Sequence, residues 1–250
     1  MVDSQLPVHN SLVRIQADGA DKPLTNTQYP RLYSHNLCPF SARCRYALAS
    51  KGIKFQECWV DLDEKREWHK ALGGQAPILE FPDGTTFTDS GIIQQYAIEA
   101  GAGQGIELVP SDPLVAAKMR VRMAECMPLM KNAFGVILSR GEDDEKITLY
   151  KNETLPTFEK MCADAGGKWL MGTDEITQLD LTFGAMWDII FLMDKGCYAD
   201  VGEKLKIRET APNWVAYMER FRAHPILKDH CFIEEASEAH GIRSRAWNKD

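Results

Sequence analysis

The chain has 250 residues, of which 44% are hydrophobic and 26% charged, with 18 Gly and 12 Pro. These proportions are those of an ordinary globular protein, and they exclude collagen-like, coiled-coil and low-complexity chains. A formal net charge of -7 offers polyanions no general electrostatic attraction, so we expect no nucleic-acid partner.

The cysteines and the apolar segments indicate the compartment. Seven cysteines is an odd number, and the first 30 residues contain no apolar stretch typical of a secretion signal. No apolar run reaches the ~18 to 20 residues that cross a bilayer. The best candidate, residues 181–193, is interrupted by Asp188. We therefore expect a cytoplasmic protein with reduced thiols and no membrane span.

Residues 1–30 are polar, lack periodicity and contain Asp-Gly and Lys-Pro dipeptides, which predicts a flexible or loosely docked N-terminal extension. The pattern changes at Arg31. The elements expected next, in chain order, are strand 31–34, helix 41–50, strand 55–60, helix 63–72, strand 77–81, strand 85–88 and helix 91–100. A parallel crossover followed by a hairpin predicts that residues 31–100 form a mixed sheet covered by helices, as in the thioredoxin-like fold.

The strand signals end at residue 100. Residues 101–113 carry three Gly and two Pro, a composition typical of a linker, and residues 114–250 are expected to form an all-helical C-terminal domain. Apolar residues in the first helix recur at steps of four or three, and these are Val115, Met119, Met123, Met127, Met130, Phe134 and Leu138. We expect this stripe to face inward and Pro128 to kink the helix.

Three further helices are expected in the C-terminal domain. The second covers residues 147–165, and the last covers residues 212–223. The third has the clearest start, because Thr177 and Asp180 can form a capping box in which each side chain bonds to the backbone amide of the other residue.

The sequence Cys38-Pro39-Phe40-Ser41 lies just after the first of these strands, at the start of a helix. A thiol at a helix N-terminus faces unpaired amide donors and the positive end of the helix dipole, which can lower a thiol pKa from about 8.5 into the ~3.5 to 7.5 range. We therefore expect Cys38 to react as a thiolate. Ser41 stands where a dithiol oxidoreductase carries its second cysteine, so the second thiol must come from another molecule.

The other charged and sulfur-bearing residues near this motif receive a plainer interpretation. Arg43 and Arg45 follow on the same helix and could add positive potential near the thiol, but the role we expect for them is that of solvated surface charges. The remaining cysteines are expected to be small, apolar core residues; they are Cys44, Cys58, Cys126, Cys162, Cys197 and Cys231.

Two later motifs could bind a short peptide. Ala76-Pro77 precedes a strand, and a cis bond at this position of the fold would let the amide and carbonyl of Ala76 pair with an extended peptide. Asp89-Ser90 opens a helix, which it can cap, and it can also bind the carboxylate and ammonium groups of an amino-acid terminus. Lys65 could meet a second carboxylate or could simply be solvated.

Together these segments resemble the glutathione transferase superfamily and, with cysteine in place of tyrosine or serine, its omega class. The matching segments are RLYSHNLCPFSARCRYALASKGI, KREW, QAPILE and TDSGIIQQY. The chain is also similar to plant dehydroascorbate reductases and chloride intracellular channel proteins. The segment between Trp68 and Pro77 is shorter than in omega enzymes, and Asp89 replaces the glutamate usual in that class.

The resemblance implies an α/β plus all-α protein, with an N-terminal thioredoxin-like domain followed by a helical bundle. It implies that Cys38 forms a mixed disulfide with glutathione, the cosubstrate, without a metal. The implied glutathione contacts are Phe40 beside the tripeptide, Ala76 and Pro77 at its cysteinyl backbone, Asp89 and Ser90 at its γ-glutamyl end, and Lys65 at its glycyl carboxylate. Members of the family commonly pair as homodimers.

The expected activity is glutathione-dependent thiol transfer, with a disulfide, a small electrophile or dehydroascorbate as second substrate. Met127, Phe134 and Trp187 could line the site of this acceptor, although residues of these types at helical spacing are more often core. One alternative is a membrane-interacting protein similar to the chloride intracellular channels, although Arg43, Arg45, Lys51 and Lys54 interrupt any apolar run in the segment that follows Cys38. Another is a non-catalytic module that binds glutathione or a protein.

Overall fold

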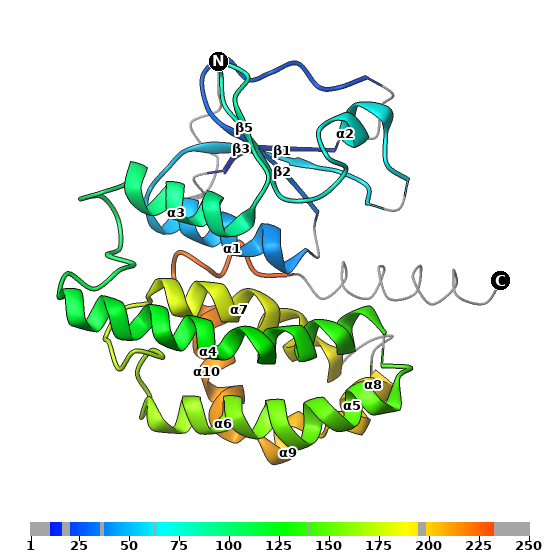
Figure 1. Ribbon diagram of the computed structural model, residues 1–250, viewed down its shortest axis with the longest axis vertical. Coiled ribbons are helices and arrows are strands. Elements are labelled where there is room, and N and C mark those ends of the chain that lie inside the picture. Colours follow the sequence, from blue (N-terminus) through cyan, green and yellow to red (C-terminus); the bar gives the residue numbers. More distant parts are fainter. Residues whose placement is uncertain are drawn as a thin grey trace. The chain divides into compact units, whose positions relative to one another are not determined.

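The computed structural model describes residues 11–16, 21–35, 38–62, 64–139, 141–194 and 199–232. The chain divides into two compact units, Met1–Glu107 and Leu108–Asp250. The described part of the first unit contains a β-sheet with three helices, and the described part of the second is helical (Figure 1). None of the described helices has the length and hydropathy needed to cross a membrane.

The first unit is built on a five-stranded mixed sheet with the order β1-β3-β2-β4-β5. Its strands are β1 (Ser11–Gln16), β2 (Arg31–Ser34), β3 (Phe55–Trp59), β4 (Ile78–Glu80) and β5 (Thr86–Phe87). β1 and β2 lie on either side of β3 and parallel to it, whereas β4 is antiparallel to both β2 and β5. The predicted parallel crossover and the hairpin that follows it are confirmed, as is the thioredoxin-like fold.

Three helices accompany the sheet: α1 (Pro39–Ser50), α2 (Glu67–Ala71) and α3 (Ser90–Ala100). α1 and α3 pack against each other (Figure 1). After α1, Gly52 adopts a φ of +68°, a conformation that favours glycine and ends the helix as the sequence predicts. α2 is shorter than expected, so Lys65 precedes the helix instead of lying within it.

The segment predicted to be a flexible extension contributes an edge strand to this sheet. β1 pairs with β3 along residues 11–16 through backbone hydrogen bonds, which require no hydrophobic periodicity. The segment that follows is also held, because Arg31 Nη2 donates to the carbonyl oxygen of Leu24 (2.5 Å) and Lys22 pairs with the buried carboxylate of Glu80. The prediction of a loosely docked arm is therefore wrong for these residues.

The described part of the second unit consists of helices and helical turns. They are α4 (Pro113–Leu138), α5 (Asp144–Leu149), the π-helical turn η1 (Tyr150–Thr154), α6 (Leu155–Asp164), α7 (Gln178–Phe191), the 3-10 turn η2 (Leu192–Asp194), α8 (Ala199–Leu205), α9 (Ile207–Thr210) and α10 (Pro212–Ala223). The single helix predicted over 147–165 is interrupted by η1. Pro156 has no N–H to donate to the carbonyl of Asn152, which accounts for the change of hydrogen-bond pattern.

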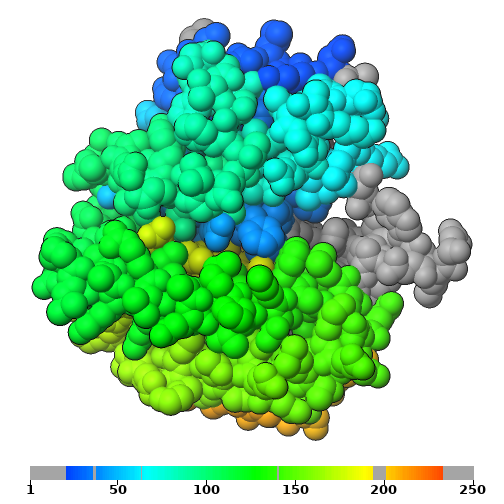
Figure 2. Space-filling model, viewed as in Figure 1, coloured from blue at the N-terminus to red at the C-terminus, as the bar shows by residue number. Residues whose placement is uncertain are grey.

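The apolar stripe predicted for α4 is only partly correct. Met119 and Met130 are buried, but Met127 and Leu138 are 41% and 62% exposed. Counting in steps of four drifts around a helix of 3.6 residues per turn, and smaller residues such as Ala133 occupy buried positions instead. One side of α4, green in Figure 2, is at the surface. The helix continues through Pro128, and the predicted kink stays a prediction.

α7 is the core helix of the second unit, and its residues from Gln178 to Ile190 are all buried. The predicted capping box between Thr177 and Asp180 is confirmed, and the Asp180 carboxylate also accepts from the Leu170 amide (2.9 Å) and the Tyr217 hydroxyl (2.8 Å). Gly184 is required by close packing, because a Cβ there would lie 2.3 Å from the Phe221 ring.

Candidate functional site

Cys38 is the N-cap residue of α1, at the point where the chain leaves β2 and enters the helix. Pro39 occupies the first turn, where its missing N–H costs no intrahelical bond. The Cys38 sulfur lies 3.5 Å from the carbonyl oxygen of Ala76, and the cysteine is 9% exposed. The side chain of Cys38 does not cap the helix by a hydrogen bond. Because Cys38 is the N-cap residue, its sulfur lies beside the positive end of the helix dipole, as the sequence predicts.

The loop that presents Ala76 is held by a histidine that sequence analysis missed. The Ala76–Pro77 bond is cis, as predicted. His69 Nε2 lies 2.9 Å from the carbonyl oxygen of Gln75, and the Gly74 amide donates to the His69 carbonyl at 2.8 Å. A carbonyl oxygen only accepts, so Nε2 carries the hydrogen. His69 is 1% exposed and fixes the two residues before Ala76.

Asp89 and Ser90 lie where α3 begins, and each has hydrogen-bond partners within this unit. Asp89 is the N-cap residue, and its Oδ1 accepts from the amides of Gly91 (2.7 Å) and Ile92 (2.9 Å). The Ser90 hydroxyl accepts from two nitrogens of Arg43, Nε at 3.0 Å and Nη2. Ser90 is buried, whereas Asp89 is exposed. The functional interpretation of this pair stays a prediction, beside the observed capping of α3 by Asp89.

Both arginines of α1 have partners, so the prediction that they are solvated is wrong. Arg43 is half-buried, and its guanidinium carbon lies 5.7 Å from the centre of the Phe40 ring. Arg45 is buried and forms an ion pair with Glu57 at 3.0 Å. Ser90 lies 47 residues from Arg43 and Glu57 lies 12 residues from Arg45, so local patterns give no sign of these two contacts.

The other described cysteines fit the predicted core role better than a nucleophilic one. Cys44 is fully buried, and its thiol donates to the carbonyl oxygens of Phe40 (3.3 Å) and Ser90 (3.5 Å). Burial raises the pKa of the Cys44 thiol and raises that of Cys58 to about 12. Burial also raises the pKa of Cys126 and Cys162. Two thiols remain: Cys231 is half-buried, and Cys197 lies outside the described residues.

The predicted glutathione contacts of the first unit are linked by a chain of neighbouring residues. Lys65 is exposed, and its Cδ would lie 3.5 Å from a Cβ placed on Gly74, two residues before Ala76. At the other end, a Cβ on Gly91 would lie 3.0 Å from Asp89 Oδ1 and 3.7 Å from Arg43 Nη2. The contacts already described join Arg43 to Phe40 and Ser90, and Cys38 to Ala76.

The three residues predicted to line an acceptor site belong to the second unit. Trp187 has no exposed surface and packs against Phe158, with the ring centroids 4.6 Å apart. We therefore assign Trp187 to the hydrophobic core. Met127 is exposed and Phe134 is half-buried, both on α4, and their role at an acceptor site stays a prediction.

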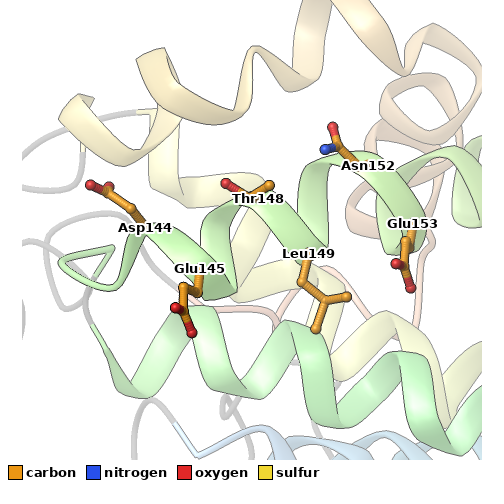
Figure 3. A pocket seen from close by; sticks show the side chains of 6 residues that line it. All are labelled: Asp144, Glu145, Thr148, Leu149, Asn152 and Glu153. Atoms are coloured by element: carbon orange, nitrogen blue, oxygen red, sulfur yellow. The ribbon is translucent and has the colours of Figure 1, made fainter.

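A shallow hollow in the second unit lies along α5 and η1 (Figure 3). The side chains that line it are Asp144, Glu145, Thr148, Leu149, Asn152 and Glu153. They provide three carboxylates but no thiol or imidazole. We assign this hollow no part in thiol chemistry.

Comparison with known proteins identifies the family. Residues 32–105 match the family model described as the N-terminal domain of glutathione S-transferase. Glutathione S-transferase omega-1 of Mus musculus is 30% identical over 207 residues, which cover 80% of this chain and 79% of that protein. The chain belongs to the glutathione transferase superfamily. The omega-1 enzyme of Sus scrofa is 32% identical over 135 residues, 52% of this chain and 54% of that protein, so this transferase is omega-like.

The fold of this omega-like transferase is shared with solved structures. One is a glutathione S-transferase from Methylobacillus flagellatus KT with glutathione bound. It has a TM-score of 0.63 and 21% identity, covering 82% of this chain and all of that one. This likeness shows that the transferase has the fold predicted from its sequence, a thioredoxin-like part and a helical part.

Proposed function

We propose that this omega-like glutathione transferase catalyses glutathione-dependent thiol transfer through a mixed disulfide at Cys38. The observation that carries the proposal is the position of the Cys38 sulfur, at the N-terminus of α1 and 3.5 Å from the Ala76 carbonyl oxygen. The start of a helix is a position that binds anions, and the nucleophile in thiol exchange is the thiolate. Ser41, one turn further along, cannot form an internal disulfide, so the intermediate must be resolved by an external thiol.

The proposed reaction has two exchange steps. The Cys38 thiolate attacks the glutathionyl sulfur of a glutathionylated thiol; a Cys38–glutathione disulfide forms, the original S–S bond breaks, and the departing thiolate takes a proton from solvent. A second glutathione loses its proton to solvent and attacks the same glutathionyl sulfur. Oxidised glutathione leaves, and the Cys38 thiolate is restored. The net exchange consumes one glutathione and releases one thiol and one oxidised glutathione.

Other acceptors of the predicted class fit the same site. A small disulfide enters by the same exchange, and a small electrophile accepts the glutathione thiolate directly. Dehydroascorbate gains two electrons and two protons, which two glutathione molecules supply as they form one disulfide. Glutathione itself is assigned to the neighbours of Cys38 named above, with Ala76 at its cysteinyl backbone and Lys65 at its glycyl carboxylate. We propose a homodimer as the assembled enzyme.

The test compares two cysteines of one helix. Purified wild-type protein, Cys38→Ser and Cys44→Ser are assayed for glutathione-dependent reduction of bis(2-hydroxyethyl) disulfide and of a glutathionylated peptide. We expect Cys38→Ser to lower turnover by at least about 100-fold, because the nucleophile is lost. Cys44→Ser should stay near wild type, since a hydroxyl can make the same bonds to the Phe40 and Ser90 carbonyls.

Intact mass after incubation with oxidised glutathione gives a second measurement. Wild type and Cys44→Ser should gain the mass of one glutathionyl group, and Cys38→Ser should gain none. Disulfide reduction that survives Cys38→Ser would overturn the mechanism. Glutathione binding by calorimetry without turnover of any acceptor would instead favour a non-catalytic binding module.

A further inference from the structure

A buried ion pair lies at the end of β2, the strand that leads to Cys38. Glu57 on β3 has no exposed surface, and Arg45 on α1 is 3% exposed. Arg45 Nη1 donates to Glu57 Oε1 at 3.0 Å, and the Ser34 hydroxyl donates to the same oxygen at 2.7 Å. Arg45 Nη1 also donates to Ser34 Oγ at 3.1 Å. The three side chains therefore form one closed cluster, with one member each from β2, β3 and α1.

The cluster adds little to the stability of the fold by its charges alone. Taking two charges out of water costs about as much as their attraction returns, and apolar side chains of the same volume often stabilise a core as well. The position of the pair offers a second role. Ser34 is the last residue of β2, four residues before Cys38, and Arg45 follows Cys38 by seven residues on α1.

Arg45 is directed towards the start of α1. Residues seven apart lie on the same face of a helix, about 10 Å apart along its axis, and long side chains point back towards the helix N-terminus. The bond from Arg45 to Ser34 shows this direction, because Ser34 precedes the helix. Burial acts to lower the pKa of Arg45, but its electrostatic interactions with Glu57, Tyr46 and Cys38 and its hydrogen bond to Glu57 raise it. Arg45 is therefore charged, and close enough to Cys38 for the two groups to interact.

Further charged or titratable groups surround the thiol on neighbouring elements. They are Arg43 and Cys44 on α1, Asp89 at the start of α3 and His69 on α2. Arg43 is half-buried and Asp89 is exposed, so solvent screens their charges more than the charge of Arg45. The Arg45–Glu57 pair therefore combines full burial with a balance of charge that a single substitution can change.

We propose that Arg45 is a positioning residue whose buried charge supports the anionic form of Cys38, and that Glu57 limits this effect by offsetting the charge. Ser34 holds the pair against the strand that leads to Cys38. This inference rests on the proposed function, because Cys38 is the nucleophile of that reaction.

The experiment changes one charge at a time and measures the rate of Cys38 alkylation as a function of pH. Wild type, Glu57→Gln, Arg45→Met and Ser34→Ala react with iodoacetamide in the absence of glutathione, and peptide mapping follows Cys38 alone. Glutamine keeps the size of the glutamate and an oxygen that accepts from Ser34 and Arg45. Ser34→Ala is the matched control, because it removes hydrogen bonds from the cluster but no charge. Melting temperatures report the stability of each form.

We expect shifts of opposite sign. A nearby positive charge favours the anion of a thiol, and a nearby negative charge disfavours it. Glu57→Gln should therefore lower the pH of half-maximal alkylation of Cys38 by about 0.5 unit or more, and Arg45→Met should raise it by a similar amount. Both substitutions should lower the melting temperature, so a loss of stability alone does not give opposite shifts. Ser34→Ala should leave the pH of half-maximal alkylation close to that of wild type.

A rise or no change in Glu57→Gln would overturn the inference, as would a fall or no change in Arg45→Met. A shift in Ser34→Ala as large as that in Arg45→Met would also overturn it, because lost hydrogen bonds would then be the cause. If Arg45→Met fails to fold, Glu57→Gln and Ser34→Ala still decide the question. Alkylation needs no glutathione, so a wild type without turnover would refute the proposed function and leave this test intact.

Discussion

Six cysteines with free thiols lie in the described part of the chain, and their surroundings differ in ways that matter for reactivity. Cys38 is the N-cap residue of α1, and its sulfur lies 3.5 Å from the Ala76 carbonyl oxygen. Cys44 lies about 1.7 turns further along the same helix and is fully buried. Burial raises the pKa of its thiol, and the positive charge of Arg43 lowers it by less. Position along one helix therefore separates the proposed nucleophile from a core residue.

Alkylation at controlled pH tests this separation. A thiol reacts as its thiolate, so a raised pKa reduces the reactive fraction at every pH below it. With a pKa of about 12, Cys58 should have almost no thiolate at pH 6 or 8. We expect iodoacetamide to modify Cys38 at pH 6 faster than it modifies an unstructured cysteine, and to leave Cys44 and Cys58 unmodified even at pH 8. Peptide mapping by mass spectrometry measures both.

The control for this experiment is the unfolded chain. In denaturant all three thiols should react at similar rates, because the helix dipole and the burial are both lost. The idea of an activated thiolate fails if folded Cys38 reacts at pH 6 no faster than a free cysteine peptide.

Single residues also show where sequence reasoning succeeds. The position of Cys38 at a helix start and the cis bond of Ala76–Pro77 could be predicted, because Cys38 lies between a strand and a helix and Ala76-Pro77 directly precedes a strand. Arg43 and His69 could not. Arg43 donates a hydrogen bond to Ser90, 47 residues away. The sequence around His69 looks like that of a core histidine, and only the folded structure shows its hydrogen bond to the Gln75 carbonyl. Contacts of this kind depend on the folded backbone, which composition and periodicity do not describe.

At the scale of elements, the start of α7 combines a local motif with long-range contacts. The Thr177–Asp180 capping box was predictable because its residues lie three apart. The bonds from the Leu170 amide and the Tyr217 hydroxyl to the same carboxylate were not, since they depend on packing. Burial raises the pKa of Asp180, and these donors offset the effect only in part.

Replacing Asp180 by asparagine tests how much this cluster stabilises the second unit. The carboxylate accepts from the Leu170 and Thr177 amides and from the Thr177 and Tyr217 hydroxyls. An amide group brings an –NH2 among donors that need an acceptor, so we expect a loss of about 2–3 kcal/mol in the free energy of unfolding. Urea titration followed by circular dichroism measures it.

A matched control lies at the start of α4. Asp112 caps that helix through bonds to the Leu114 and Val115 amides, but it is exposed. Asparagine caps helices about as well as aspartate, so Asp112→Asn should shift the free energy of unfolding by no more than about 0.5 kcal/mol. Similar losses at both positions would mean that burial of the Asp180 cluster contributes nothing beyond capping.

Other elements show why part of the fold escapes prediction. β1 alternates apolar and polar residues only over residues 13–16, inside a polar segment, and its pairing with β3 is what identifies it as a strand. The π-helical turn η1 divides a segment whose apolar period reads as one helix. The strands and helices of residues 31–100 were predictable, because there turn residues and hydrophobic period agree with the tertiary packing.

At the scale of the whole molecule, the family expectation of a homodimer makes a prediction about surface side chains. α4 exposes Leu114 (63%) and Val121 (56%), which lie seven residues apart and therefore on one face of the helix. Large apolar side chains that remain in water forfeit the free energy that burial would provide. We propose that this face of α4 contributes to the dimer contact.

Light scattering coupled to size-exclusion chromatography measures the mass of the assembly. Wild type should have twice the chain mass of 28.2 kDa, and Val121→Glu should shift it towards the single chain, because the contact would then bury an unpaired charge. Leu138→Glu is the control: Leu138 is also exposed on α4 (62%), but it lies about 100° around the helix from Val121. It should leave the mass unchanged. A monomeric wild type, or dissociation caused by Leu138→Glu alone, would contradict this placement of the contact.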